Sequence, residues 1–247
     1  MFPSLTAEEI RFQGHGGDEI AGYLARPGGS GPFPGVAVLH HMTGLDEATL
    51  EIVNRFAAHG YVSVSPSLHF REGAEAAPDD AAAASRAAGG VPDARMLGDL
   101  DGAVRHLRSL PECSGKVGVI GYCSGGRQAF LAACSLAIDA AVDCYGSFVN
   151  TTPPSTTPLT YLPVLDRAAE MRCPLLGIFG GEDPNPSPEH ATEISEELQR
   201  LGKVHEFHVY PNAGHGFFDT SSVRYSPAAA RDGWEKVLGF FGRYLAG

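Results

Sequence analysis

Apolar and polar positions follow two periods that alternate along the chain, and their order predicts a layered α/β fold. Short apolar runs rich in β-branched residues, as in buried strands, occupy residues 35–41, 61–68, 116–122, 140–146, 174–180 and 204–210. Residues 19–26 alternate between apolar and polar and predict an edge strand. Helical spacing predicts helices over residues 46–59, 93–110, 124–136, 187–201 and 228–245. This alternation predicts a mostly parallel central sheet with helices on both faces.

Two segments interrupt this alternation: residues 73–90, rich in Ala with Pro and Asp, and residues 148–165, rich in Thr and Pro. Because strands continue on either side of both, we interpret them as surface excursions within a single domain covering residues 1–247. Ligands of open parallel sheets bind beyond the carboxyl ends of the strands, so loops that leave those ends form pocket walls. Residues 148–165 are therefore the better candidate for a lid.

Composition narrows the classes of protein. The chain has 247 residues, 43% hydrophobic and 19% charged, which is enough to bury a substantial core. A net charge of −11 disfavours binding to nucleic acid or an anionic membrane, which requires clustered Lys and Arg. The first residues lack the pattern of a signal peptide and no apolar run is long enough to span a membrane, so we expect a cytoplasmic protein. We expect a small-molecule partner and a monomer or homodimer.

Cysteine, histidine and glycine spacing gives no sign of a metal or nucleotide cofactor. The five cysteines contain no C-x-x-C pair, which argues against a disulfide framework or a structural zinc site. The histidines show no H-E-x-x-H spacing, and the glycine-rich stretches lack the phosphate-binding pattern G-x-x-x-x-G-K-[ST]. We therefore expect neither a metal nor another cofactor.

The segment 121–126, GYCSGG, lies where a predicted strand ends and a predicted helix begins. A turn this tight between strand and helix requires small residues on either side of its central side chain. The turn would place Cys123 at a helix N-terminus, where the helix dipole favours a thiolate. Cys123 is therefore the candidate nucleophile; the alternative is an ordinary buried cysteine.

Acyl transfer also requires a base and an acid that orients it, and in this fold they follow the nucleophile in the order acid, then histidine. Asp183 follows the predicted strand 174–180, with Glu182 as its immediate competitor. His215 follows the last predicted strand on a loop flanked by glycines. We interpret His215 as the base rather than as a surface histidine.

The segment 115–126, GKVGVIGYCSGG, the G-G-x-D sequence ending at Asp183 and the A-G-H sequence ending at His215 resemble the dienelactone hydrolase (carboxymethylenebutenolidase) family from about Gly35 to the C-terminus. The resemblance implies an α/β-hydrolase fold, with Cys123 as nucleophile, His215 as base and Asp183 as its orienter. It also implies an oxyanion hole formed by the backbone N–H groups of Ser124 and Met42.

Two positions depart from the pattern of this family. A glutamate that usually follows the third strand is replaced by His41, from which we hypothesise a more permanently ionised Cys123. An arginine that binds the substrate carboxylate is replaced by Asp219, which makes dienelactone itself a poor substrate. Arg71 or Arg95 are other possible sources of positive charge.

Aromatic residues near the expected pocket suggest an apolar, uncharged substrate, although each is individually more typical of packing: Tyr145, Tyr161, Phe217 and Phe218. The sequence therefore predicts a cysteine-dependent hydrolase of esters or lactones. The alternatives are phosphotriester hydrolysis in the same pocket, a non-catalytic ligand-binding protein of this fold, and a thiol redox protein.

Overall fold

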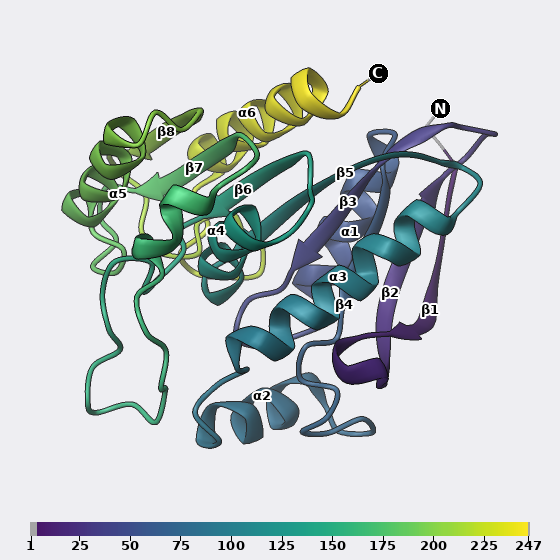
Figure 1. Cartoon of the computed structure of the whole chain (residues 1–247), viewed down its shortest axis with the longest axis horizontal. Helices are drawn as coiled ribbons and strands as arrows, with labels where there is room; N and C mark the ends of the chain where they lie inside the picture. Colours follow the sequence, from purple (N-terminus) through teal and green to yellow (C-terminus); the bar gives the residue numbers. More distant parts are fainter. Residues whose placement is uncertain (1–3, 247) are drawn as a thin grey trace.

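The computed structural model describes residues 4–246, whose eight strands form one sheet in the order β1-β2-β4-β3-β5-β6-β7-β8 (Figure 1). β1 pairs antiparallel with β2, and β2 pairs antiparallel with β4. All neighbours from β4 to β8 pair in parallel, which confirms the predicted mostly parallel sheet. The strands are β1 (Leu5–Gln13), β2 (Glu19–Pro27), β3 (Phe33–Leu39), β4 (Val62–Pro66), β5 (Cys113–Tyr122), β6 (Ala140–Cys144), β7 (Leu175–Gly180) and β8 (His205–Tyr210).

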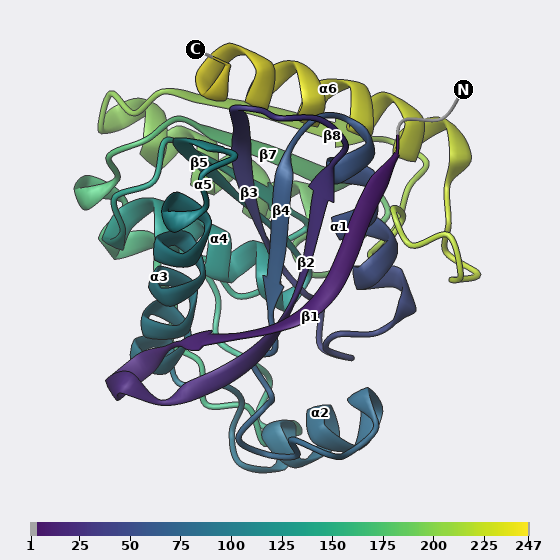
Figure 2. The same ribbon diagram turned by 90° about the vertical axis from the view of Figure 1, so that its right-hand side faces the viewer.

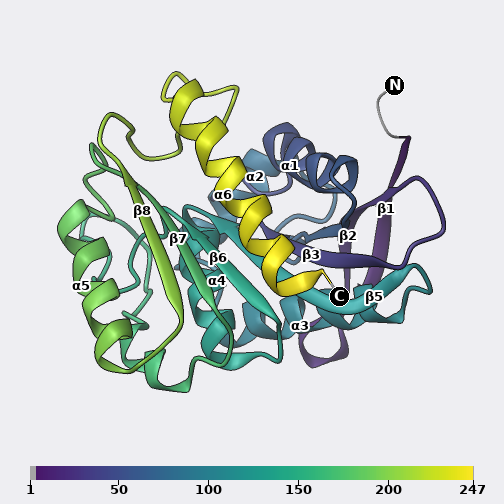
Figure 3. The same ribbon diagram turned by 90° about the horizontal axis from the view of Figure 1, so that it is seen from above.

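Helices cover both faces of the sheet (Figure 3). α1 (Glu47–Ala58) and α6 (Pro227–Leu245) share one apolar core, in which Phe56 of α1 and Trp234 of α6 are in contact. α3 (Asp93–Ser109), α4 (Ser124–Ser135) and α5 (Pro188–Arg200) share the core on the other face. Because successive side chains of a strand point to opposite faces, the apolar run of β3 supplies both cores.

The expected edge strand is not at the edge. Residues 19–26 belong to β2, which lies between β4 and an additional strand, β1 (Figure 2). β1 is mostly exposed and rich in charged residues, so it lacks the apolar signal of a buried strand. β1 pairs antiparallel with β2 along its whole length, and the short 3-10 turn η1 (His15–Gly17) connects the two strands. Charged side chains on a strand that has a neighbour on one side only suit this edge position.

The excursion 73–90 is not irregular throughout, because it contains α2 (Pro78–Ala87). Pro78 stands at the first helical position, and alanine has the highest helix propensity of all residues. Ala81, Ala82 and Ser85 form the buried side of α2. The alanine-rich composition was therefore a helix signal.

Residues 149–164 contain no helix or strand, and the segment extends from the sheet toward α2 (Figure 1). The Thr160 N–H donates to the Gly89 carbonyl over 3.0 Å. The two excursions identified from sequence are therefore in contact. Within residues 4–246, no helix is long and apolar enough to span a membrane.

Candidate active site

Cys123 occupies a strained turn between β5 and α4. Its φ and ψ are 57° and −118°, a conformation that costs a non-glycine residue about 1–3 kcal/mol. Two hydrogen bonds maintain the turn: the Cys123 N–H donates to the Cys144 carbonyl over 3.0 Å, and the Gly126 N–H donates to the Cys123 carbonyl over 2.9 Å. Strain of this kind persists only where surrounding structure enforces it, and it projects the thiol out of the line of the sheet.

The glycines around Cys123 are required by close backbone contacts. A Cβ atom on Gly121 would lie 1.8 Å from the Gly125 carbonyl oxygen. One on Gly125 would lie 2.2 Å from the Leu39 carbonyl oxygen and 2.8 Å from that of His40. The loop that leaves β3 therefore runs directly beside the turn that carries Cys123.

Asp183 and His215 meet because the turns after β7 and β8 pack on one another. The Glu182 N–H donates to the Ala213 carbonyl over 2.9 Å, and a Cβ atom on Gly180 would lie 2.4 Å from that same oxygen. His215 Nδ1 then lies 2.7 Å from Asp183 Oδ2. Asp183 is 3% exposed, whereas Glu182 is exposed, so the geometry selects Asp183 over its neighbour as the partner of His215.

The charged form of His215 is stabilised by its two neighbours. Burial of the ring opposes its charged form, but hydrogen bonding to Asp183 and to Cys123 outweighs burial and raises the pKa of His215 to about 10. The other oxygen of the Asp183 carboxylate accepts the Asn185 N–H over 2.9 Å, which fixes the carboxylate plane. Asp183 and His215 are thus paired through a 2.7 Å contact, and a catalytic series that includes Cys123 stays a prediction.

The two backbone amides expected to form an oxyanion hole come from the start of α4 and from the loop after β3. Ser124 begins α4, so its N–H belongs to the first turn, where helix amides lack an intrahelical acceptor. Met42 follows β3 on the loop that runs beside Gly125. Among residues 4–246, the Met42 N–H has no backbone hydrogen-bond acceptor.

His41 is directed at the start of α1. Its Nε2 atom lies 2.7 Å from Asp46 Oδ2 and 2.7 Å from Thr43 Oγ1. Asp46 is the N-cap of α1, and hydrogen bonds from His41 and Thr49 overcome burial to hold the pKa of its carboxyl well below its usual range. This nitrogen of His41 is therefore occupied by the α1 cap, and an effect of His41 on Cys123 stays a prediction.

Four of the expected pocket residues, His41, Tyr145, Phe218 and Asp219, line one cavity of about 20 Å³. That volume accommodates about one water molecule, so this cavity is too small for a substrate. Tyr145 also packs edge-on against His215, with ring centroids 5.1 Å apart. It therefore contributes to positioning the imidazole.

Phe217 and Tyr161 have different surroundings. Phe217 is fully buried and packs against Tyr145 and Tyr210, and its place in a substrate pocket stays a prediction. Tyr161 lies on the excursion 148–165, with the Arg127 guanidinium 4.8 Å from its ring centroid.

Asp219 organises its own loop. Its Oδ1 atom accepts the Ser221 N–H over 2.9 Å and the Ser221 hydroxyl over 2.6 Å. The position that would carry a cation in enzymes acting on dienelactone is thus a carboxylate bound within a turn.

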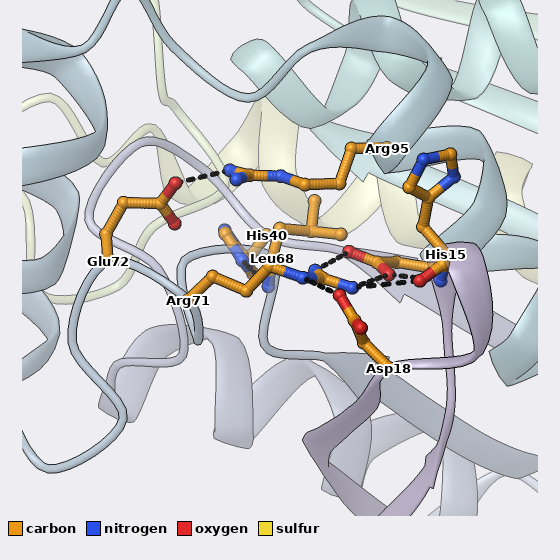
Figure 4. A network of polar contacts seen from close by, with 8 residues as sticks. His15, Asp18, His40, Leu68, Arg71, Glu72 and Arg95 are labelled. Atoms are coloured by element: carbon orange, nitrogen blue, oxygen red, sulfur yellow. Dashed lines mark hydrogen bonds and ion pairs between the residues drawn. The ribbon is translucent and has the colours of Figure 1, made fainter.

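Arg71 and Arg95 are both paired with carboxylates (Figure 4). Arg71 donates to fully buried Asp99 over 2.7 Å and to Asp18 over 2.9 Å. Arg95 donates to Glu72 over 2.5 Å. Their charges are therefore neutralised within the protein.

Arg127 is a residue near the site that the sequence did not single out. It stands one helical turn after Cys123, is 1% exposed, and donates 2.7 Å and 2.9 Å hydrogen bonds to the two oxygens of Asp93. It also donates to the Leu162 carbonyl over 2.7 Å. A buried arginine is rare unless paired, but sequence alone does not distinguish it from an exposed one.

A mostly parallel eight-stranded sheet, covered on both faces and carrying a strained strand-to-helix turn at Cys123, defines an α/β-hydrolase. A profile of the dienelactone hydrolase family matches residues 20–245. The chain therefore belongs to the dienelactone hydrolase family and is a hydrolase of the ester and lactone type.

Known proteins agree with this family assignment. A Methylorubrum extorquens protein named "Putative carboxymethylenebutenolidase" is 32% identical over 243 residues, covering 97% of this chain and 82% of that protein. The crystal structure of a "Putative Dienelactone Hydrolase" from Klebsiella pneumoniae is 28% identical and superposes with a TM-score of 0.83, covering 98% of this chain and 100% of that one. A dienelactone hydrolase-like promiscuous phosphotriesterase from metagenomic libraries has the same fold at 21% identity, with a TM-score of 0.79 and coverage of 98% and 100%.

Proposed function

We propose that the protein hydrolyses uncharged carboxylic esters or lactones, with Cys123 as nucleophile, His215 as acid and base, and Asp183 as the residue that orients His215. The observation that carries the proposal is the interaction of His215 with both partners: Nδ1 lies 2.7 Å from Asp183, and Cys123 contributes to the raised pKa of the ring. An imidazolium beside a thiol favours the thiolate, which is the nucleophilic form.

In the proposed cycle, the Cys123 thiolate adds to the carbonyl carbon and the π electrons move to the oxygen, where the N–H groups of Met42 and Ser124 stabilise the negative charge. The intermediate collapses to a thioester and expels an alkoxide. The imidazolium of His215 gives its proton to that alkoxide, and neutral His215 then accepts a proton from the attacking water. Loss of the thiolate releases the acid and restores the starting ion pair.

The charges around the site support an uncharged substrate. Arg71, Arg95 and Arg127 are all paired with carboxylates. Asp219 adds negative charge beside His41 in place of the expected cation. A substrate carboxylate would have to displace an existing ion pair to gain a partner, whereas a neutral ester would not.

A panel of p-nitrophenyl esters and lactones, each with and without a carboxylate, tests both parts of the proposal. We expect turnover of the neutral compounds that is lost in Cys123→Ala, and a lower kcat/KM for each carboxylate-bearing partner. Turnover that persists in Cys123→Ala would contradict the nucleophile, and a preference for the anionic compounds would contradict the substrate class. Binding without turnover would indicate a ligand-binding protein, and a peroxide-dependent reaction a redox protein.

Phosphotriester hydrolysis in the same pocket is the second candidate. Attack on a tetrahedral phosphorus centre also requires a nucleophile and donors that stabilise a negatively charged oxygen. Asp219 stands where a cation would suit a carboxylate substrate. A solved structure with the same fold bears the name of a promiscuous phosphotriesterase. We expect slow release of p-nitrophenol from a neutral phosphotriester that depends on Cys123; no such release would eliminate this candidate.

A further inference from the structure

His40 is a buried histidine next to the loop that carries Met42. It is 3% exposed, and its ring bridges the ends of two neighbouring strands. Nδ1 lies 2.7 Å from the His41 carbonyl oxygen after β3. Nε2 lies 3.2 Å from the backbone nitrogen of Leu68 after β4, and Figure 4 shows these two residues side by side. Both ring nitrogens are therefore engaged with backbone groups.

These two contacts determine the tautomer of His40. Leu68 offers an N–H, so Nε2 must accept and carries no proton. The remaining proton is on Nδ1, which donates it to the His41 carbonyl. Burial and the neighbouring His69 lower the pKa of His40 to about 3, so His40 is neutral near pH 7.

The carbonyl that His40 holds belongs to the same peptide unit as the Met42 N–H. In a trans peptide the C=O and the N–H point in opposite directions. The His41 carbonyl also accepts the Gly44 N–H over 3.0 Å, so two donors fix the plane of this peptide. Directing its oxygen at His40 turns the Met42 N–H to the opposite side of the loop.

From this geometry we propose that His40 is a positioning residue, which aims the Met42 N–H at the oxygen of the reacting carbonyl. The inference rests on the proposed function, since it assigns His40 a part in stabilising the oxyanion. The hydrogen bond to the His41 carbonyl also polarises the peptide and strengthens the Met42 N–H as a donor. His40 itself does not touch the substrate.

The test compares two reactions of Cys123 that differ in their need for an oxyanion hole. Acylation by p-nitrophenyl acetate forms a tetrahedral oxyanion, whereas alkylation by iodoacetamide displaces iodide at a saturated carbon and forms none. In His40→Met, which keeps much of the volume but has no donor, we expect acylation about 10- to 100-fold slower than in wild type, because outright loss of one oxyanion donor costs about 10²- to 10³-fold. Alkylation should change by less than about threefold, since it requires only the thiolate.

Two further variants separate positioning from simple packing. His40→Gln retains an N–H donor near the same place, so it should recover at least part of the lost acylation rate. His69→Phe changes the neighbour whose ring lies 4.8 Å from that of His40 without removing the bond to His41, and it should acylate at nearly the wild-type rate.

The outcomes distinguish this inference from the proposed function. Equal acylation by His40→Met and wild type, in an enzyme that Cys123→Ala inactivates, would overturn the positioning role alone. The positioning role would also be overturned if the rates of acylation and alkylation fell by the same factor in His40→Met and His40→Gln recovered neither. Turnover that persists in Cys123→Ala would overturn the proposed function and the inference with it.

Discussion

The guanidinium of Arg127 binds the carboxylate of Asp93 through two hydrogen bonds, of 2.7 Å and 2.9 Å, and a third hydrogen bond joins it to the Leu162 carbonyl. One buried side chain on α4 thus links the helix that begins beside Cys123, the start of α3 and the excursion 148–165.

Replacing Arg127 by Met should free the excursion. Lost contacts with Leu162 and Tyr161 would expose this segment to protease and raise KM for esters about 3- to 10-fold, with a smaller effect on kcat, if the segment forms a pocket wall. Limited proteolysis with mass spectrometry, and steady-state kinetics, measure the two effects. Arg167→Met, which removes an exposed ion pair with Glu170, is the control and should change neither. Unchanged cleavage in Arg127→Met would show that the arginine does not hold this segment.

Asp183→Asn should reduce kcat by about 10²- to 10⁴-fold, because an amide in place of the carboxylate no longer stabilises the His215 imidazolium or fixes its tautomer. Glu182→Gln is the matched control: it removes a charge one residue away, at an exposed position, and should keep activity within about threefold of wild type. Kinetics with a neutral ester distinguish the two. A greater loss in Glu182→Gln would reverse the assignment of the acid.

The pH dependence of kcat/KM should reflect the raised pKa of His215. Activity that needs the imidazolium should persist above pH 7 and decline as His215 loses its proton near pH 10, not near 6.5. Cys123→Ser removes the thiolate neighbour, so the pKa of His215 measured by NMR should fall. An identical titration in Cys123→Ser and wild type would argue against the ion pair.

The raised pKa of His215 also makes the free energy of unfolding depend on pH. The folded state binds the His215 proton more tightly than the unfolded chain does, so this contribution is complete below about pH 6.5 and is lost as the pH rises through about 10. The free energy of unfolding of wild type minus that of His215→Gln should therefore decrease between pH 6.5 and 10 in urea titrations. A difference that stays constant over this range would contradict the shift.

Gly125→Ala should abolish ester turnover and lower the melting temperature, because the added Cβ would lie 2.2 Å from a backbone oxygen of β3 and would separate the Cys123 turn from the Met42 loop. Gly239→Ala is the control. Gly239 lies within α6 with no atom within 4 Å of an added Cβ, so alanine there should stabilise the protein by up to about 1 kcal/mol. Normal activity in Gly125→Ala would show that the turn tolerates a side chain.

The sequence predicted the parallel part of the sheet because buried strands carry unbroken apolar runs and the helices between them show clear spacing. Their predicted ends differ from the structure by only a few residues, as for residues 46–59 against α1, Glu47–Ala58. β1 escaped prediction because it is exposed and is determined by pairing with β2 rather than by an apolar pattern. α2 escaped prediction because its helix signal is the propensity of alanine, without large apolar residues at helical spacing.

The order of the site residues along the chain was predictable from the turn at Cys123, since this fold places the acid and the histidine after later strands. The preference for Asp183 over Glu182 came from the family resemblance, because the local sequence does not tell which carboxylate the packed turns bury. Phe217 was expected near the pocket because it is aromatic. Its burial in the core depends on packing against Tyr145, which the sequence does not show. The roles inferred for His40 and Arg127 depend on contacts with backbone groups that are distant in the sequence, and such contacts leave no local pattern.

Cys123, Met42, Asp183 and His215 follow four different strands, namely β5, β3, β7 and β8. No fragment that lacks any of these strands contains a complete set, so the reaction reports on the integrity of the sheet from β3 to β8. Thiol acylation can thus serve as an internal probe of cooperative unfolding. Thiol acylation does not report on the β1–β2 hairpin, because the hairpin supplies none of these four residues. Local unfolding of the hairpin would therefore be detected by hydrogen exchange while turnover is unchanged.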